Sequence, residues 1–433
     1  MNIIITGAGI AGLTTALSLR RAHHQPITIY ERSPTATAFG AGISLGPNCT
    51  RILTSFGLDY AKWRITKGTR GHVYDGTSLA RVGEIGEESF RVSDEEFQAY
   101  AHRVDLQNAL LELVTGEEGE GTPVRIVYGA GVTAYDCDAG SITLESGAQH
   151  FADLVIAADG MHSLAPAAVL GRDVRLRDTG VTVVRFMLAA SVVAEDPVTA
   201  SLFPRGLFSF FFHADRRRFL LHYPVRDGEE LNFGMYRLEE GVGEGVERML
   251  RFTCDREGLE RELEGFGEGL VKLAGMAGDV LPVWRLQDRE PLERWWRGRV
   301  LVVGDAAHPM LPMQGQGAAM CVEDAGALGH VFSGFVGEGD GKMAIGELEN
   351  RFRAFESVRR GRVSVVQLIS RLPYHRIAVD EMWDELCKFM NEDELPGRGG
   401  NTDVRNWLGR YNLEDACKRA MEDVGLRDKS FVA

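Results

Sequence analysis

The sequence predicts an α/β protein with three parts: a Rossmann-like nucleotide-binding domain, an inserted and mainly antiparallel β-sheet domain, and a C-terminal helical region. Three observations support this. A glycine-rich turn follows a buried strand at the N-terminus, β-like runs rich in Phe and Val fill the middle of the chain, and helical patterns follow them. At 433 residues the chain is too long for one compact core, so we expect domains in contact.

The composition argues against several classes of function. The chain carries 62 acidic and 48 basic residues, a net charge of −14, which disfavours a nucleic-acid or anionic-membrane partner. No apolar run reaches the roughly 18 residues of a membrane-spanning helix. The six cysteines form no Cys-x-x-Cys pair, so we expect free thiols and no metal site. These features predict a soluble, cytoplasmic protein, either a monomer or a homodimer.

The first motif is a glycine-rich turn between a strand over residues 2–6 and a helix over residues 13–22. Gly7 permits the tight turn, Gly9 lets the backbone approach a pyrophosphate, and Gly12 lets the helix pack closely on the strand. The helix N-terminus offers N–H groups to the phosphates. Glu31 ends a second strand, 19 residues after Gly12, where an acid meets ribose hydroxyls. The motif predicts a dinucleotide site without separating NAD from FAD.

Two later strands also end in motifs. Residues 153–158 form a buried strand before Asp159-Gly160, and residues 299–303 form one before Gly304-Asp305, after which a helix begins near Gly317. A carboxylate at the end of a strand can accept hydrogen bonds from a polyol such as ribitol, and the positive end of a helix stabilises a negatively charged reduced flavin. The alternative is a buried Asp that caps the helix.

Together these segments resemble the para-hydroxybenzoate hydroxylase superfamily of FAD-dependent monooxygenases, and the salicylate hydroxylase-like members in particular. The resemblance covers nearly the whole chain. The segments that carry it are Gly7–Gly12 with Glu31-Arg32, Gly40–Ile43, His102–Leu106, Asp159-Gly160, Asp288-Arg289, Gly304–Pro312 with Gly315–Gly317, and Asn406–Leu408.

This resemblance implies FAD as the cofactor and NADH or NADPH as the co-substrate. It further implies that dioxygen reacts through a flavin C4a-hydroperoxide to hydroxylate a small aromatic substrate, a phenol or an aromatic acid. The residues for which it implies cofactor contacts are Gly7, Gly9, Ile10, Ala11, Gly12, Glu31, Arg32, Gly42, Arg103, Asp159, Gly304, Asp305, Pro312, Gly315, Gly317 and Ala318.

One departure from the family pattern follows Asp159-Gly160. The family usually continues Asp-Gly-x-x-Ser-x-x-Arg, whereas this chain has Pro166 where the arginine is expected. The contacts around this loop, including those to the nicotinamide cofactor, are therefore not carried over from the family.

The middle of the chain reads as a substrate domain. Residues 181–188, 207–213, 218–224 and 231–236 are β-like runs separated by turn residues. We expect the FAD-binding domain in two parts, residues 1–173 and 285–343, with the substrate domain at residues 174–284 between them. Residues 344–433 then form the C-terminal helical region, including a helix over residues 347–372 and a loop over residues 391–402.

Two residues of the substrate domain are candidates for catalysis. Arg185 lies in a run otherwise suited to a buried face, where it would hold a phenolate or carboxylate, and Tyr223 would hydrogen-bond the substrate oxygen. The alternative for Arg185 is a structural ion pair, and the alternative for Tyr223 and for the neighbouring His222 is simple packing in the sheet. For His308 a structural role in its turn is favoured over proton transfer.

Two other functions stay open at this point. A flavin enzyme of this kind would also suit epoxidation, Baeyer–Villiger insertion or dearomatisation of a secondary metabolite. A non-catalytic dinucleotide-binding protein would share the first glycine motif but would not need the segment from Gly304 to Gly317.

Overall fold

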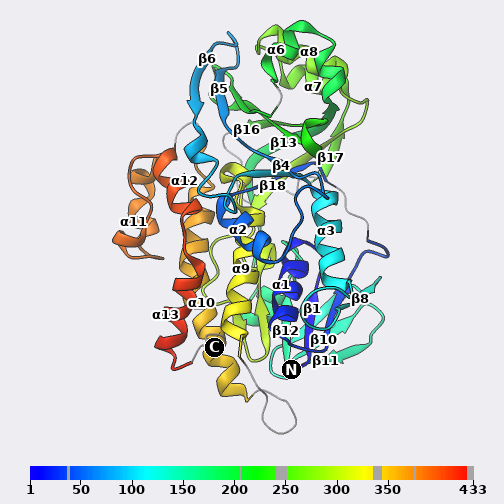
Figure 1. The fold of residues 1–433 in the computed structure, drawn as a ribbon, viewed down its shortest axis with the longest axis vertical. Coiled ribbons are helices and arrows are strands. Elements are labelled where there is room, and N and C mark those ends of the chain that lie inside the picture. The colour runs from blue at the N-terminus through cyan, green and yellow to red at the C-terminus, as the bar shows by residue number, and fades with distance from the viewer. Residues whose placement is uncertain (37–39, 205, 240–250, 335–343, 374–376, 427–433) are drawn as a thin grey trace.

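The computed structural model describes residues 1–36, 40–204, 206–239, 251–334, 344–373 and 377–426. Figure 1 shows a lower half built around one sheet and its helices, an upper half built around a larger sheet, and C-terminal helices along one side. The two sheets therefore stand in separate layers, as the α/β interpretation with an inserted β-sheet domain requires.

The lower sheet has six strands, parallel except at one edge. Its order is β19 (Trp296–Arg297), β20 (Val300–Val302), β12 (Leu154–Ala157), β1 (Ile3–Thr6), β2 (Ile27–Glu31) and β8 (Arg125–Tyr128). Strand β1 is buried along its whole length, which explains its unbroken apolar sequence. The three strands that end in the predicted motifs, β1, β12 and β20, are neighbours, so their motifs meet at one edge.

Three helices cover this sheet: α1 (Ile10–Arg21), α3 (Arg103–Thr115) and α9 (Gly317–Phe332). Helix α1 lies close against the end of β1 because its third residue, Gly12, has no side chain. A Cβ atom on Gly12 would stand 1.9 Å from the backbone oxygen of Gly7. Helices α1 and α9 pack on each other, which brings their N-terminal ends to the same side of the sheet.

The upper sheet has eight strands, antiparallel except between β14 and β5. Its order is β17 (Arg251–Cys254), β18 (Leu281–Asp288), β13 (Arg177–Ala189), β16 (Glu230–Leu238), β15 (Arg218–Val225), β14 (Phe208–Phe212), β5 (Gly71–Asp75) and β6 (Arg81–Ile85). The four strands expected from the sequence are all present. Two more, β5 and β6, come from residues 71–85, which the sequence had placed in the FAD-binding part. We propose that they belong to the substrate domain, because they extend its sheet.

Smaller elements complete the two halves. Two three-stranded sheets are formed by β3 (Gly42–Leu45), β7 (Ala99–His102) and β4 (Thr66–Lys67), and by β9 (Val132–Asp136), β10 (Ser141–Leu144) and β11 (Gln149–Phe151). The shorter helices are α2 (Pro47–Ser55), α4 (Ala165–Leu170), α5 (Ala190–Ala194), α6 (Pro197–Leu202), α7 (Arg256–Glu262) and α8 (Glu268–Met276), and the single 3₁₀ turns are η1 (Glu87–Ser89), η2 (Arg226–Gly228), η3 (Gly304–Ala306) and η4 (Pro312–Gln314).

The C-terminal region is helical, as expected. Its elements are α10 (Ile345–Ile369), η5 (Val379–Met382), α11 (Trp383–Leu386), η6 (Glu392–Glu394), α12 (Asn401–Gly409) and α13 (Leu413–Asp423). Helices α10 and α13 pack against α9. The predicted loop at residues 391–402 contains η6 and the first turn of α12. Residues 427–433, the end of the predicted region, lie outside the described residues.

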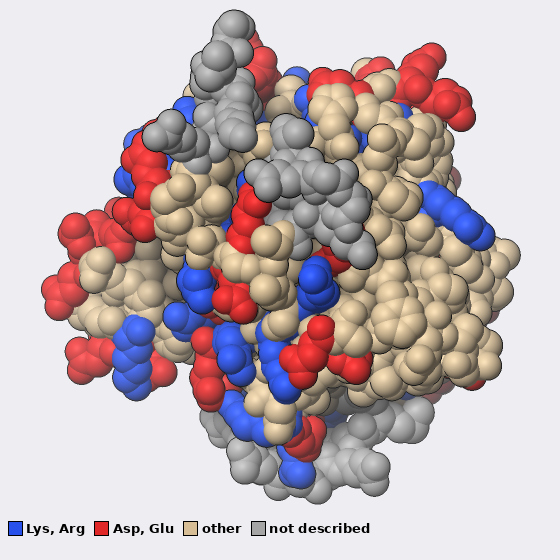
Figure 2. Space-filling model, turned by 90° about the horizontal axis from the view of Figure 1, so that it is seen from below, with Lys and Arg blue, Asp and Glu red and all other residues tan. Residues whose placement is uncertain are grey.

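The surface charge, the state of the cysteines, and the search for membrane-spanning helices and metal sites concern the partners considered from the sequence. Acidic and basic side chains are interspersed on the face shown in Figure 2, with neither sign forming a continuous field. All six cysteines are free. Within the described ranges, no helix has the length and apolarity to cross a membrane, and no cluster of three or more His, Cys, Asp or Glu residues is arranged to hold a metal ion.

Candidate active site

Two cavities lie where the motifs meet. The larger one, of about 850 Å³, is bounded by the strand ends of the lower sheet on one side and by the upper sheet on the other. This volume falls in the range of small-molecule sites. A second cavity of about 160 Å³ lies against β2. Gly9 and Arg103 line both cavities, so a long ligand can run from one cavity into the other past these two residues.

The N-terminus of α1 faces the passage between the cavities. No side chain of the described residues caps this helix, so its first N–H groups are left for a ligand. A Cβ atom on Gly9 would meet no protein atom within 4 Å, and Ile10 and Ala11 follow it along the wall of the larger cavity. A phosphate group suits this position, because the backbone N–H groups and the positive helix end both favour an anion.

The smaller cavity contains the acid predicted for ribose. The two carboxylate oxygens of Glu31 accept hydrogen bonds from the backbone N–H groups of Ala8 and Ser33, at 2.7 Å each. A carboxylate oxygen can accept a second bond, so Glu31 is still able to bind a hydroxyl group. Arg32, also predicted to contact the cofactor, is exposed and lines neither cavity.

Asp305 projects into the larger cavity from the turn after β20. Its side chain is exposed to the cavity, and within the described chain it accepts no hydrogen bond. Burial raises the pKa of this carboxyl, opposed by the charges of His308, Arg103 and Arg289. Gly304 itself is buried behind the wall, with φ of 59° and a would-be Cβ atom 2.6 Å from Ala11. A carboxylate that faces a cavity and has no partner among the described residues fits the hydroxyl groups of a polyol.

Helix α9 supplies a second uncapped N-terminus on the same cavity. No side chain caps it, and Gly317 and Ala318 line the cavity wall. Pro312 and Gly315 line the preceding turn, in which Gly315 has a φ of 63°. Two helix ends, one free carboxylate and a connecting passage thus match a ligand that carries phosphates, a polyol and an electron-rich ring. These features fit FAD.

Comparisons with known proteins agree with this fit. A family model described as "FAD binding domain" matches residues 1–344. The FAD-dependent monooxygenase cfoG of Aspergillus candidus is 32% identical over 98% of this chain and 95% of its own length. The chain belongs to this FAD-binding family. It is an FAD-dependent monooxygenase, which removes the alternative of a non-catalytic dinucleotide-binding protein.

Other relatives and solved structures extend the comparison. A 3-hydroxybenzoate 6-hydroxylase of Polaromonas naphthalenivorans is 30% identical to this chain, over 95% of this chain and 96% of the length of the hydroxylase. A salicylate hydroxylase solved with its substrate aligns with a TM-score of 0.73 at 21% identity, covering 100% of this chain and 99% of that one. The protein CtdE, solved with FAD and a substrate, gives 0.75 at 21% identity, with 98% of each chain covered. These two structures establish the shared fold.

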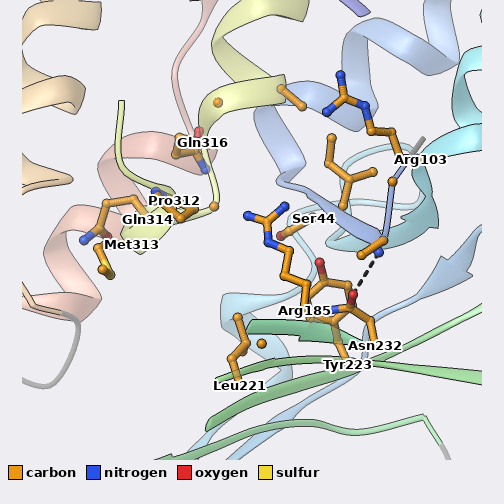
Figure 3. Close-up of a pocket in the computed structure, with 18 of the residues that line it drawn as sticks. Ser44, Arg103, Arg185, Leu221, Tyr223, Asn232, Pro312, Met313, Gln314 and Gln316 are labelled. Carbon is orange, nitrogen blue, oxygen red and sulfur yellow. Dashed lines mark hydrogen bonds between the residues drawn. The ribbon is translucent and has the colours of Figure 1, made fainter. Parts of the chain in front are cut away.

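The opposite wall of the monooxygenase cavity is formed by the upper sheet, and Figure 3 shows Arg185 and Tyr223 on it. In the described ranges no carboxylate lies within ion-pair distance of Arg185, so the alternative of a structural ion pair has no partner there. Tyr223 stacks on Tyr100 with ring centroids 4.8 Å apart and has no hydrogen-bond partner among the described residues. Burial raises its pKa, so the hydroxyl stays protonated at neutral pH and can donate a hydrogen bond.

A contact that the sequence did not predict joins the two walls. The side-chain oxygen of Asn232 accepts a hydrogen bond of 2.9 Å from the backbone N–H of Gly42 (Figure 3). A Cβ atom on Gly42 would stand 2.5 Å from the ring of Tyr223. The glycine therefore allows this strand to approach the sheet closely. No local pattern marks Asn232, because its partner lies 190 residues away in the chain.

The side chain of Asp159 differs from expectation: it lines neither cavity. It accepts a 2.6 Å hydrogen bond from the hydroxyl of Tyr135, which in turn lies 2.7 Å from the hydroxyl of Thr6. Burial raises the pKa of this carboxyl. The residue that follows it, Gly160, lines the larger cavity instead. The motif therefore places Gly160, and not the carboxylate of Asp159, against the larger cavity.

Arg289 supports the loop whose family arginine is replaced by Pro166. Its guanidinium donates to the backbone oxygen of Met161 at 3.0 Å and to that of Ala306 at 2.7 Å. It thus connects the loop after β12 with the loop that carries Asp305. The sequence offered one signal for this residue, the Asp288-Arg289 pair, but that signal did not say what the arginine binds.

Two histidines stand away from the chemistry. His222 faces the side of the sheet opposite to its neighbours Leu221 and Tyr223, which line the cavity, as alternation along a strand requires. His308 is buried, and its Nε2 atom lies 2.6 Å from Asp324. The structural interpretation made for His308 agrees with this contact.

Proposed function

We propose that this monooxygenase hydroxylates an aromatic substrate, a phenol or an aromatic acid, with NADH or NADPH as the reductant. The observation that carries the proposal is the arrangement of the cavity. The FAD-binding wall, with Asp305 and the tip of α9, faces a wall that offers one unpaired guanidinium, one tyrosine hydroxyl and several aromatic rings. The relatives named for hydroxybenzoate and salicylate support the same substrate class.

Each part of the cofactor would have its own partner. Gly7 and Gly12 shape the turn, and Gly9, Ile10 and Ala11 hold the pyrophosphate at the end of α1. The other proposed contacts are Glu31 with the adenosine ribose, Arg103 with the pyrophosphate, Asp305 with the ribitol, and Gly42, Pro312, Gly315, Gly317 and Ala318 with the ring.

FAD, when bound, accepts a hydride from the nicotinamide and activates dioxygen. The chain supplies position and electrostatics. Arg185 would pair with the phenolate or carboxylate of the substrate and so favour its ionised, electron-rich form. Tyr223, which keeps its proton, would donate a hydrogen bond to a substrate oxygen and fix the orientation of the ring. The aromatic rings of the sheet keep water away and strengthen both contacts.

The test is turnover by the purified protein. We expect a yellow protein whose oxidation of NADH or NADPH accelerates when hydroxybenzoic acids or larger phenols are added, with products heavier by one oxygen atom. A protein that binds FAD yet converts only alkenes or ketones would overturn aromatic hydroxylation. We place the reaction in the cytoplasm, where a reducing environment suits six free thiols, in a monomer or homodimer.

A further inference from the structure

The larger cavity has a third wall, formed by the C-terminal helix α12. Arg405, Leu408 and Gly409 line the cavity. These residues stand three and four positions apart, so they share one face of the helix. The helix packs on α2 and on η1, and η1 directly follows the edge strand β6. Arg185 belongs to β13, which is five strands away from β6 in the order of the upper sheet. Arg405 and Arg185 therefore enter the cavity from different walls.

The guanidinium of Arg405 has capacity for a ligand. Its Nε atom donates to the backbone oxygen of Asn401, one turn earlier, at 3.2 Å. Its two terminal nitrogens have no partner within the described chain, and no described carboxylate lies within ion-pair distance. Arg285, another cavity arginine, differs in this respect, because it pairs with Asp178 and Glu239.

Helix α12 is held firmly, so Arg405 stands on a defined support. Arg362 of α10 donates to the backbone oxygen of Leu408 at 3.0 Å and stacks over Trp407 and Tyr411. The indole N–H of Trp407 donates to the backbone oxygen of Glu394 at 2.7 Å. A side chain on such a support loses less freedom when it binds a ligand, which favours a specific contact.

The larger cavity has an excess of positively charged side chains, which favours an anionic ligand. The ionisable arginine and carboxylate side chains that line it are Arg103, Arg185, Arg285, Arg405 and Asp305. FAD accounts for Arg103, and the structural pairs account for Arg285. The guanidinium groups of Arg185 and Arg405 then remain without a negative partner among the described residues, in a chain whose net charge is −14. A ligand that supplies the missing charges would be favoured over a neutral one.

We propose that Arg405 binds a carboxylate of the substrate, separate from the phenolic or acidic group that Arg185 holds. This inference rests on the proposed function. The substrate is then an aromatic molecule that carries an acidic group remote from the ring to be hydroxylated. Arg405 determines specificity for that remote group.

The experiment compares Arg405→Met with wild type on matched acids and amides. The probes are para-hydroxycinnamic acid and a hydroxybiphenyl carboxylic acid, each beside its primary amide. We expect the substitution to lower kcat/KM for the acids roughly 10- to 150-fold, the range for a lost charge-assisted hydrogen bond, and for the amides no more than about threefold. The dissociation constants of the acids, measured from the change in flavin absorbance, should rise by the same factor. Arg410→Met, an exposed arginine just beyond α12, is the control.

Three results would overturn the inference. The first is an equal loss for acids and amides. The second is no loss for either. The third is a raised KM for NADH or NADPH with unaltered KM for the acids, which would assign Arg405 to the phosphates of the nicotinamide cofactor. Turnover of the amides by wild type tests the proposed function separately, since it needs no remote carboxylate.

Discussion

Arg362 of α10 forms a bidentate pair with Glu323 of α9, with N–O distances of 2.9 Å for both hydrogen bonds. Both side chains are fully buried, and Arg359 binds the same carboxylate. Arg362 also holds α12 through the backbone oxygen of Leu408. This one carboxylate therefore connects α9, whose N-terminus lines the larger cavity, with the C-terminal helices.

Loss of Glu323 should be severe. Glu323→Ala would leave two buried guanidinium groups without their shared partner, and breaking a buried pair from one side costs about 3–5 kcal/mol. Urea unfolding should show a loss of this size. The matched control is Glu349→Ala on α10, whose pair with Arg353 is exposed, and for which we expect a change below about 1 kcal/mol. Equal effects of the two substitutions would contradict the role given to the buried network.

Replacing Gly9 or Gly12 by alanine should have different effects: the change at Gly12 should impair folding, and the change at Gly9 should weaken FAD binding. Gly12→Ala places a Cβ atom 1.9 Å from backbone, so we expect a misfolded or insoluble protein. Gly9→Ala meets no protein atom, so the protein should fold while its new methyl group occupies the approach to the phosphates. Circular dichroism should be normal for Gly9→Ala, and its affinity for FAD should fall at least about tenfold, or 1.4 kcal/mol. Normal FAD binding by Gly9→Ala would show that the pyrophosphate does not bind beside Gly9.

Asp305→Ala tests the ribitol site. The carboxylate has no protein partner in the described chain, so its removal costs the fold little, but it removes acceptors for the cofactor. Hydrogen bonds to a charged group contribute about 1.5–3 kcal/mol each, so we expect FAD affinity to fall by roughly tenfold or more and the purified protein to be nearly colourless. A variant as yellow as wild type would remove Asp305 from the ribitol site.

Arg185→Ala separates the substrate site from the cofactor site. The side chain stands on the sheet wall, so FAD content should match wild type, while kcat/KM for phenolic acids should fall roughly 10- to 150-fold, the equivalent of about 1.5–3 kcal/mol. Steady-state oxidation of NADH or NADPH with and without substrate measures the effect. Unaltered stimulation by substrate would exclude Arg185 from the site.

The parts of the site that follow from the sequence are those fixed by local chain geometry. Gly7–Gly12 and Gly304–Gly317 each combine a strand, a turn and a helix within about 15 residues, so their spacing alone predicts two helix ends at one sheet edge. The positions of Gly9, Asp305 and Gly317 around one cavity follow from that geometry, whereas Arg185 reaches the same cavity from a strand of the upper sheet. The strand and helix patterns likewise locate the upper sheet and α10.

The missed features depend on partners far away in the sequence. Asp159 turns toward Tyr135 because a hydroxyl from β9 happens to reach it, and no pattern near Asp159 reveals that. Strands β5 and β6 extend a sheet whose other members begin about 100 residues later. Arg405 stands on α12 beside Asn406–Leu408, a segment that contributed to the family resemblance, but the sequence gave no role for Arg405 itself. Contacts between segments far apart in the chain determine the orientation of Asp159, the place of β5 and β6 in the sheet, and the position of Arg405. Such contacts leave no periodic pattern in the local sequence.

The buried imidazole of His222 should lower the free energy of unfolding, and this loss should increase as the pH falls below 6.5. Both ring nitrogens are buried and have no partner among the described residues, and burial lowers the pKa of the imidazole to about 3. The ring packs on Phe203 and Phe233, with centroids 4.8 Å and 5.2 Å away. Replacing it by leucine removes an unsatisfied polar group, so His222→Leu should raise the free energy of unfolding by about 1–3 kcal/mol at pH 7.

The pH dependence of this gain has a definite sign. Below the unfolded pKa of 6.5, the histidine of the unfolded wild-type chain takes up a proton while the folded one stays neutral down to a pH of about 3. Wild-type stability therefore falls as pH falls through this window, by about 1.4 kcal/mol per pH unit, and leucine removes that loss. The difference between variant and wild type should be about 2 kcal/mol larger at pH 5 than at pH 7, measured by urea unfolding at both values. FAD content and turnover should match wild type, because His222 faces away from the cavity, and a pH-independent difference would contradict a neutral, buried imidazole.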